Sequence, residues 1–191
     1  FGLTPGVMAG SARLLDQELV GMPEAALRPI RARDAGFVFQ QPLTALSPHV
    51  RVAAALKEAA MQAGAAAPSR EALEAMLDRV GLSGAYLPRY PHQLSGGERQ
   101  RLCIAMAVAH GPKLLIADEP TSALDAARRA DIMALLTAIR REQRLAMLLI
   151  SHDLAAIDAH ADRLIVMRSG QVVEQGAART LISAPQSDYA R

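Results

Sequence analysis

The fold of this chain is decided by residues 94–125, which begin with the run LSGGERQR (94–101) and end with SALD (122–125). Between these ends lies LLIADEP (114–120), an apolar run that terminates in two carboxylates and a proline. The glycines after Ser95 predict a turn that opens a helix. The apolar run predicts a buried strand that delivers Asp118 and Glu119 to the edge of a sheet.

Composition is consistent with one substantial domain that has an aliphatic core. The chain has 191 residues, of which 51% are hydrophobic but only 3% are aromatic. Its net charge is +2, and the basic residues are interspersed with acids. Nucleic-acid binding requires basic residues that gather on one face, so no nucleic-acid partner is expected. No apolar stretch reaches the length needed to span a bilayer.

The apolar periodicity outside the central stretch predicts an alternation of helices and strands. We expect a strand at 36–40 that ends on Gln40, helices near 24–33, 52–62 and 70–80, and no strand between 41 and 93. Next come a helix at 96–110, a strand at 114–118, a helix at 125–142, a strand at 146–150, a helix at 153–160 and a strand at 163–167, followed by a turn at 168–171 into an edge hairpin. Strands this continuously apolar predict a parallel sheet covered on both faces. Cys103 lies in an apolar run and is expected in the core.

The run that starts at Ser95 has two interpretations. Ser95 and Glu98 have the spacing of a capping box, which is purely structural. Such a cap does not need glycine at both Gly96 and Gly97. The second interpretation is that the glycines let a phosphate approach the backbone at the positive end of the helix dipole.

Polar residues follow the predicted strands at one edge of the sheet. Asp118 and Glu119 could divide the tasks of phosphoryl transfer to water, one holding a metal ion and the other facing the attacking water. They could also simply solvate the strand end. His152 follows the strand at 146–150, and Gln40 ends the strand at 36–40. A metal site made of His152, Asp153 and His160 is a weaker alternative, because it lacks a convincing further ligand and would straddle a helix.

Taken together and in this order, the motifs resemble the ATP-binding subunits of ABC transporters. Residues 94–101 resemble the family's signature motif, 114–119 its Walker B, 122–125 its D-loop, 150–153 its H-loop and 38–41 its Q-loop. The runs at 37–48 and 89–93 are similar to the branch that imports oligopeptides, dipeptides and nickel. The resemblance implies an α/β P-loop NTPase (RecA-like) core with an inserted helical subdomain. Within one ABC ATPase domain, 1–40 would end the N-terminal part, 41–94 would form the helical subdomain, and 95–191 would hold the signature helix and core sheet.

The resemblance also implies roles for the site residues, with ATP and Mg²⁺ as cofactors. Ser95, Gly96 and Gly97 would contact the γ-phosphate of ATP held by a partner subunit. Asp118 would hold Mg²⁺ through its water shell, with Gln40 nearby. Glu119 would be the general base, His152 would contact the γ-phosphate, and Asp125 would lie at the dimer seam.

The partners implied are a second ABC ATPase subunit, the transmembrane permease subunits and, indirectly, a substrate-binding protein. The protein would then lie peripherally at the cytoplasmic face of the inner or plasma membrane and couple ATP hydrolysis to uptake of a solute, peptides or nickel. Two alternatives remain open from the residues: an ABC ATPase that moves no solute, and an inactive partner that contributes only its signature loop.

One element of the family pattern is missing from these residues. A phosphate-cradling P-loop has the form G-x-x-x-x-G-K-[ST], but the lysines of this sequence, Lys57 and Lys113, follow Leu56 and Pro112. We therefore expect a fragment that is truncated at its N-terminus, upstream of the Q-loop.

The 191 residues by themselves should bind ATP very weakly, because no P-loop cradles the phosphates. Isothermal calorimetry with Mg·ATP checks this, and a dissociation constant in the nanomolar range would contradict it.

Overall fold

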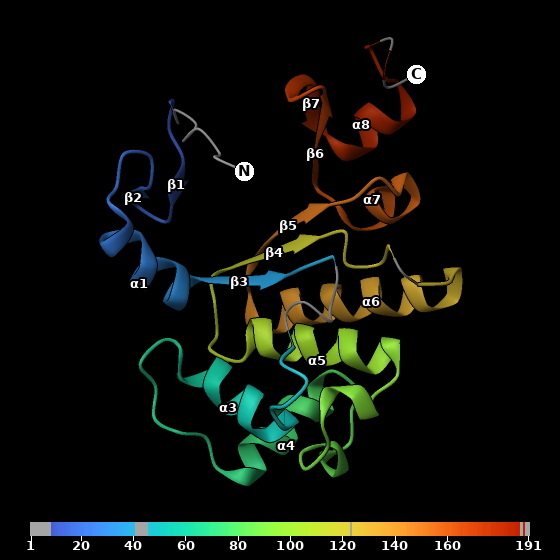
Figure 1. Cartoon of the computed structure of the whole chain (residues 1–191). Coiled ribbons are helices and arrows are strands. Elements are labelled where there is room, and N and C mark those ends of the chain that lie inside the picture. Colours follow the sequence, from blue (N-terminus) through green and yellow to red (C-terminus); the bar gives the residue numbers. More distant parts are fainter. Residues whose placement is uncertain (1–8, 41–45, 123, 188, 190–191) are drawn as a thin grey trace, which may run out of the picture.

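The computed structural model describes residues 9–40, 46–122, 124–187 and 189. At its centre lies a parallel sheet in the order β3-β4-β5, formed by Ala35–Val38, Leu114–Asp118 and Ala146–Ile150 (Figure 1). In the register, Val38 is opposite Ala117, and Asp118 is opposite Ile150. The strands predicted at 114–118 and 146–150 are confirmed. Their parallel direction brings the carboxyl ends of all three strands to one edge.

Two long helices cover one face of this sheet. Helix α5 (Gly96–Val108) and helix α6 (Ala126–Gln143) run beneath the strands in Figure 1. Every second residue of β4 points toward them, so Leu115 and Ala117 are fully buried. Cys103 of α5 is buried as predicted, and burial raises the pKa of its thiol to about 12.

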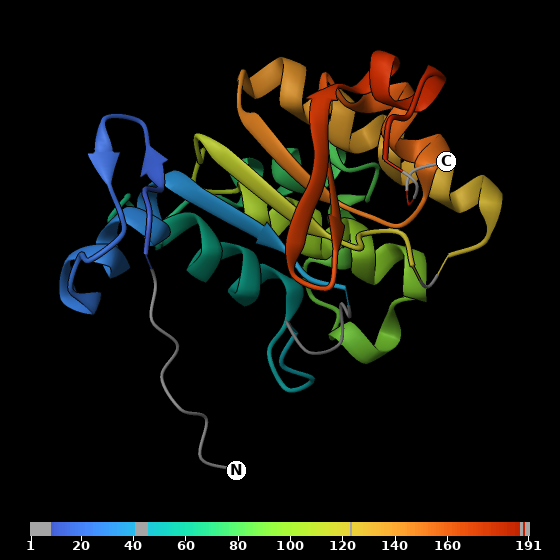
Figure 2. The same cartoon turned by 90° about the horizontal axis from the view of Figure 1, so that it is seen from above.

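The opposite face of the sheet is open, so the prediction of cover on both faces is wrong for the described residues. Figure 2 looks onto this face from above. The side chains of Phe37, Phe39, Leu148 and Ile150 are 38%, 53%, 48% and 47% exposed. The alternation in β5 therefore follows the pattern of a strand covered on one side only.

The described residues between the Q-loop and the signature are helical, as predicted. Helices α3 (Val52–Met61) and α4 (Arg70–Arg79) are followed by the short 3-10 turns η1 (Gly84–Tyr86) and η2 (Pro91–Gln93). Both α3 and α4 pack on α5. Within the run at 37–48 that resembles peptide and nickel importers, residues 41–45 lie outside the described part.

Two hairpins flank the core. Strands β1 (Arg13–Leu14) and β2 (Gln17–Glu18) precede α1 (Glu24–Asp34), and the sequence did not predict them. At the other end, α7 (Leu154–His160) leads to β6 (Arg163–Arg168), β7 (Gln171–Ala177) and α8 (Ala178–Ser183).

Two strand predictions need correction. The hairpin expected after the turn at 168–171 is confirmed, because β6 and β7 pair antiparallel. The strand at 163–167 was also expected to join the parallel sheet, but among the described strands β6 pairs only with β7. The apolar run alone could not reveal this, because it does not specify a pairing partner. The first strand ends at Val38 and not at Gln40, since the last pair of its ladder is Val38 with Ala117.

Gly36 marks the closest approach of the sheet to α5. A Cβ at position 36 would lie 2.1 Å from the carbonyl oxygen of Ala107, a backbone atom that cannot rotate away. Gly36→Ala should therefore lower the free energy of unfolding by about 1–3 kcal/mol through overpacking. Urea denaturation measures this. The matched control is Gly176→Ala in β7, where the nearest atom, of Leu181, is at 3.6 Å; equal losses in both variants would contradict the prediction.

Candidate functional site

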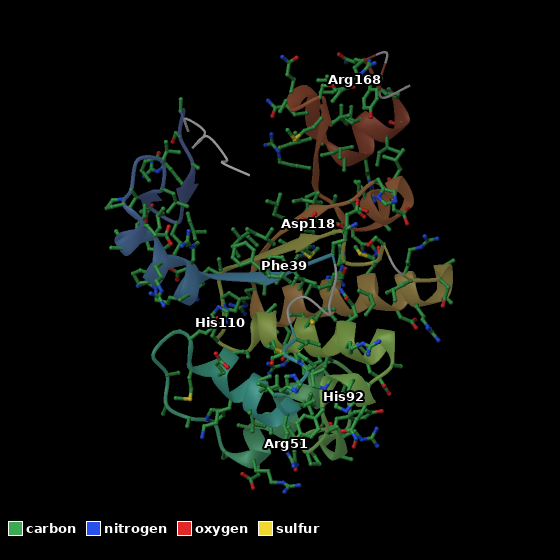
Figure 3. All side chains as sticks on the ribbon, in the orientation of Figure 1. Phe39, Arg51, His92, His110, Asp118 and Arg168 are labelled. Carbon is green, nitrogen blue, oxygen red and sulfur yellow. The ribbon has the colours of Figure 1, made fainter. Side chains whose placement is uncertain are left out.

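The carboxyl edge of the sheet holds the polar residues that the sequence singled out. Asp118 is the last residue of β4 and is exposed there (Figure 3). Glu119 follows it directly, and His152 lies two residues beyond the end of β5. Gln40 lies two residues beyond the end of β3 and is exposed. The structure thus places each of these residues just past the end of a parallel strand or, for Asp118, at its last position, where open sheets bind ligands.

Glu119 and His152 are in direct contact. Nδ1 of His152 lies 2.6 Å from Oε1 of Glu119, and the backbone N–H of His152 donates to the same oxygen over 3.1 Å. Because a carboxylate accepts, this contact places the ring proton on Nδ1. The Glu119 side chain is 17% exposed and the His152 side chain 81%. A half-buried carboxylate thus holds an imidazole that remains open to a ligand.

The backbone of Glu119 has an unusual conformation. Its φ is +46°, in the left-handed region that residues with a Cβ rarely adopt. The turn that follows is closed by the N–H and the hydroxyl of Ser122, which both donate to the Glu119 carbonyl over 3.2 Å. Such strain occurs at functional sites, where the surrounding structure maintains it.

The N-terminus of α5 forms the capping box that the sequence predicted. Ser95 Oγ accepts from the N–H of Glu98 over 3.3 Å, and a carboxylate oxygen of Glu98 accepts from the N–H of Ser95 over 2.6 Å. Gly96 and Gly97 have no positive φ, and a Cβ on either would meet nothing within 4 Å. The fold of this chain therefore does not require glycine at these positions, which favours the phosphate interpretation over a purely structural one.

Sequence reasoning missed a residue that supports this helix end. The hydroxyl of Tyr86, in η1, donates to Glu98 over 2.5 Å, while Arg89 lies 4.5 Å from the Tyr86 ring centroid. The bond from Tyr86, followed by the one from the Ser95 N–H, lowers the pKa of the Glu98 carboxyl; the same bond raises the pKa of the Tyr86 phenol. The helical region is thereby connected to the signature helix. Nothing in the Gly- and Pro-rich sequence around Tyr86 signals this contact.

Asp125 has a local structural partner. It is the N-cap of α6, and its side chain accepts from the N–H of Arg128 over 3.0 Å. It is also exposed, and its second carboxylate oxygen lies 3.3 Å from Nε of Arg128. Ala123, within the predicted D-loop, lies outside the described residues.

The alternative metal site built on His152, Asp153 and His160 is not assembled. Among the described residues no group of three or more His, Cys, Asp or Glu side chains is arranged to hold a metal ion. Nδ1 of His160 instead lies 3.0 Å from the hydroxyl of Thr137 on α6.

Residues 5–122 match the family model described as "ABC transporter", and this chain belongs to that family. The oligopeptide transport ATP-binding protein OppD of Salmonella typhimurium is 40% identical over 190 residues, which are 97% of this chain and 57% of that protein. The dipeptide transport ATP-binding protein DppD of Escherichia coli is 41% identical over 190 residues, 97% of this chain and 58% of that protein. The chain thus spans a little more than half the length of these relatives.

Solved structures confirm the predicted fold class, an α/β P-loop NTPase. The ATP-binding cassette MJ0796, solved as a dimer in a post-hydrolysis state bound to ADP and Pi, superposes with a TM-score of 0.73 at 29% identity. The match covers 87% of this chain and 72% of that chain. A second dimeric structure of MJ0796, a bacterial ABC transporter cassette, gives 0.72 at 30% identity and covers 85% and 70% of the two chains. Within the described residues, no helix is both long and apolar enough to cross a membrane.

A Cβ at position 97 would meet no other part of the chain within 4 Å, so a substitution there can test ligand binding without disturbing the fold. Gly97→Ala should leave the free energy of unfolding unchanged or raise it by about 0.5 kcal/mol, because alanine is the better helix former. The same methyl group should obstruct a phosphate at the helix end, so the rate of ATP hydrolysis by the complete protein should fall. Urea denaturation measures the stability, and a phosphate-release assay measures the rate. A variant that unfolds, or one that is fully active, would show that the glycine does not serve phosphate access.

Proposed function

We propose that this chain is part of the ATP-hydrolysing subunit of an ABC importer and that ATP hydrolysis drives the uptake of peptides. The observation that carries the proposal is the cluster of Asp118, Glu119 and His152 at the carboxyl edge of the sheet, with Glu119 in contact with His152 at 2.6 Å. The names of the relatives, which are oligopeptide and dipeptide transport proteins, support peptides as the cargo class.

In this proposal Glu119 is the general base. The strand would deliver its carboxylate next to the γ-phosphate. The left-handed backbone at Glu119 turns the side chain away from the direction it would take in a continuing strand. There it would accept a proton from the attacking water, while His152, held through its Nδ1–H, would donate to the γ-phosphate from its other ring nitrogen when the ring carries both protons. The contact between the two side chains would orient the imidazole ring before ATP arrives.

The residues at this edge also fit Mg²⁺. Asp118 offers an exposed carboxylate and Gln40 an exposed amide oxygen, and such hard oxygen donors are the ligands that Mg²⁺ prefers. We propose that Asp118 holds the ion through its water shell and that Gln40 lies beside it. The ion would neutralise charge on the β- and γ-phosphates.

Complete nucleotide sites are proposed to form between two ATPase subunits. Ser95, Gly96 and Gly97 would contact the γ-phosphate bound by the partner subunit, while Asp118 and Glu119 would serve the nucleotide of their own subunit. Each chain thus contributes two different half-sites: a signature half-site at the start of α5 and a catalytic half-site at the end of β4. Asp125 would lie at the seam. The dimeric state of the MJ0796 cassettes supports this arrangement.

The remaining partners are proposed from the family. Two transmembrane permease subunits would dock on the helical region beside Gln40, and a substrate-binding protein would act through them. The subunit would then lie peripherally at the cytoplasmic face of the membrane.

Removing the base should separate chemistry from binding. In the complete transporter, Glu119→Gln should lower kcat for ATP by about 100- to 10,000-fold, the range of general-base catalysis. ATP-bound dimers should still form, because the amide keeps the shape of the side chain. Steady-state phosphate release and size-exclusion chromatography with Mg·ATP measure the two effects.

The matched control is Glu142→Gln, since Glu142 is exposed on α6 and pairs with Arg79 outside the site. It should retain the wild-type rate. A Glu119→Gln transporter that also hydrolyses ATP at the wild-type rate would refute the base assignment and favour a subunit that contributes only its signature loop.

A further inference from the structure

A buried hydrogen bond joins the two half-sites within this chain. The side-chain amide of Gln100 donates from Nε2 to the carbonyl oxygen of Pro120 over 2.8 Å. Gln100 lies on α5 about one helical turn after Gly97, and Pro120 directly follows Glu119. The connection from the signature half-site to the proposed base therefore consists of one helical turn, one hydrogen bond and one peptide unit.

The placement of this amide requires an explanation, because burying a polar side chain is unfavourable unless it is hydrogen-bonded. Gln100 is only 3% exposed. The buried polar or charged side chains among the described residues are Asp34, Gln100 and Thr121. Two of these three lie at the junction between α5 and the loop after β4. An apolar side chain at position 100 would leave the carbonyl of Pro120 without this donor.

The loop that receives the bond is the strained one. Glu119 has its φ at +46°, and its N–H donates to the carbonyl of Ile150 over 2.9 Å. That bond anchors the loop to β5, and the bonds from Ser122 close the turn. The bond from Gln100 adds an anchor to α5. A shift of α5 relative to the sheet thus acts directly on the turn that orients the Glu119 carboxylate.

We propose that Gln100 is a positioning residue that couples the two nucleotide sites of the dimer. When the signature half-site engages the partner's nucleotide, α5 is held in one position, and through Pro120 it holds Glu119 in the geometry for attack on the subunit's own nucleotide. Hydrolysis at one site then depends on occupancy of the other. This inference rests on the proposed function.

The first test is kinetic and uses Gln100→Met in the complete transporter. Methionine has a similar length and a high helix propensity but no donor, so it removes the bond and retains the packing. We expect KM for ATP to change little and kcat to fall about tenfold, because the base is less well positioned. The Hill coefficient for ATP should be above 1 in the wild type and should fall to 1 in Gln100→Met.

The neighbouring residue supplies a matched control. Arg101 also donates from α5 to a backbone carbonyl over 2.8 Å, but its acceptor is Val80, in the helical region. Arg101→Met removes a bond of the same length from the same helix and should retain the wild-type Hill coefficient. A Gln100→Met transporter with unchanged kcat and unchanged cooperativity, or an Arg101→Met transporter that loses cooperativity equally, would overturn the coupling.

The second test needs no nucleotide. Amide hydrogen exchange at Ser122 and Leu124, whose N–H groups donate to the carbonyls of Glu119 and Thr121, should be faster in Gln100→Met than in the wild type or Arg101→Met. Gln100→Asn, which keeps an amide but is one methylene shorter, should give an intermediate rate and serves if the methionine variant does not fold. Equal exchange in all variants would refute the anchor. If exchange responds as expected but the wild-type transporter hydrolyses no ATP, the anchor stands and the proposed function fails.

Discussion

Packing of α5 against the parallel sheet is the constraint on which the rest of this structure depends. Leu102 and Ile104 of this helix are completely buried, and the approach at Gly36 is so close that no side chain fits between helix and strand. The same helix supports α3 and α4 on its other side. Burial of a large aliphatic side chain contributes about 1.5–3 kcal/mol, so moving this helix has a cost that the sheet and the helical region share. The position of its N-terminus, where the signature half-site lies, is consequently coupled to the position of the sheet.

The catalytic half-site depends on the same packing through the loop after β4. A left-handed conformation at Glu119 costs about 1–2 kcal/mol relative to a relaxed backbone. The bonds that Ser122 and Gln100 donate, and the bond that the Ile150 carbonyl accepts from the Glu119 N–H, offset that cost and select the conformation. His152 is then held by the carboxylate that this turn presents. The backbone conformation of the turn therefore sets the position of the Glu119 carboxylate, and that carboxylate in turn sets the position of His152.

Much of this could be predicted from the sequence, because the signals are local. The continuous apolar runs identified β4 and β5 with correct bounds, and the Ser95–Glu98 spacing identified the cap of α5. Pairing was less predictable. The turn at 168–171 correctly indicated that β6 forms a hairpin with β7. The run at 163–167 nevertheless has the same apolar texture as a core strand, and among the described strands β6 does not join the parallel sheet. Hydrophobic alternation specifies which face of a strand is buried, but it cannot specify which strand lies beside it.

The sequence by itself determined the order of the elements, the positions of Asp118, Glu119 and His152 at strand ends, and the glycines at the start of α5, since each depends on residues that are neighbours along the chain. Only the tertiary structure revealed the contact of Glu119 with His152, the support of Glu98 by Tyr86 and the bond from Gln100 to Pro120. These pairs are 33, 12 and 20 residues apart. Their meeting is decided by how helices and strands pack, and in the sequence Gln100 is one polar residue in a polar run, with nothing to mark it as buried.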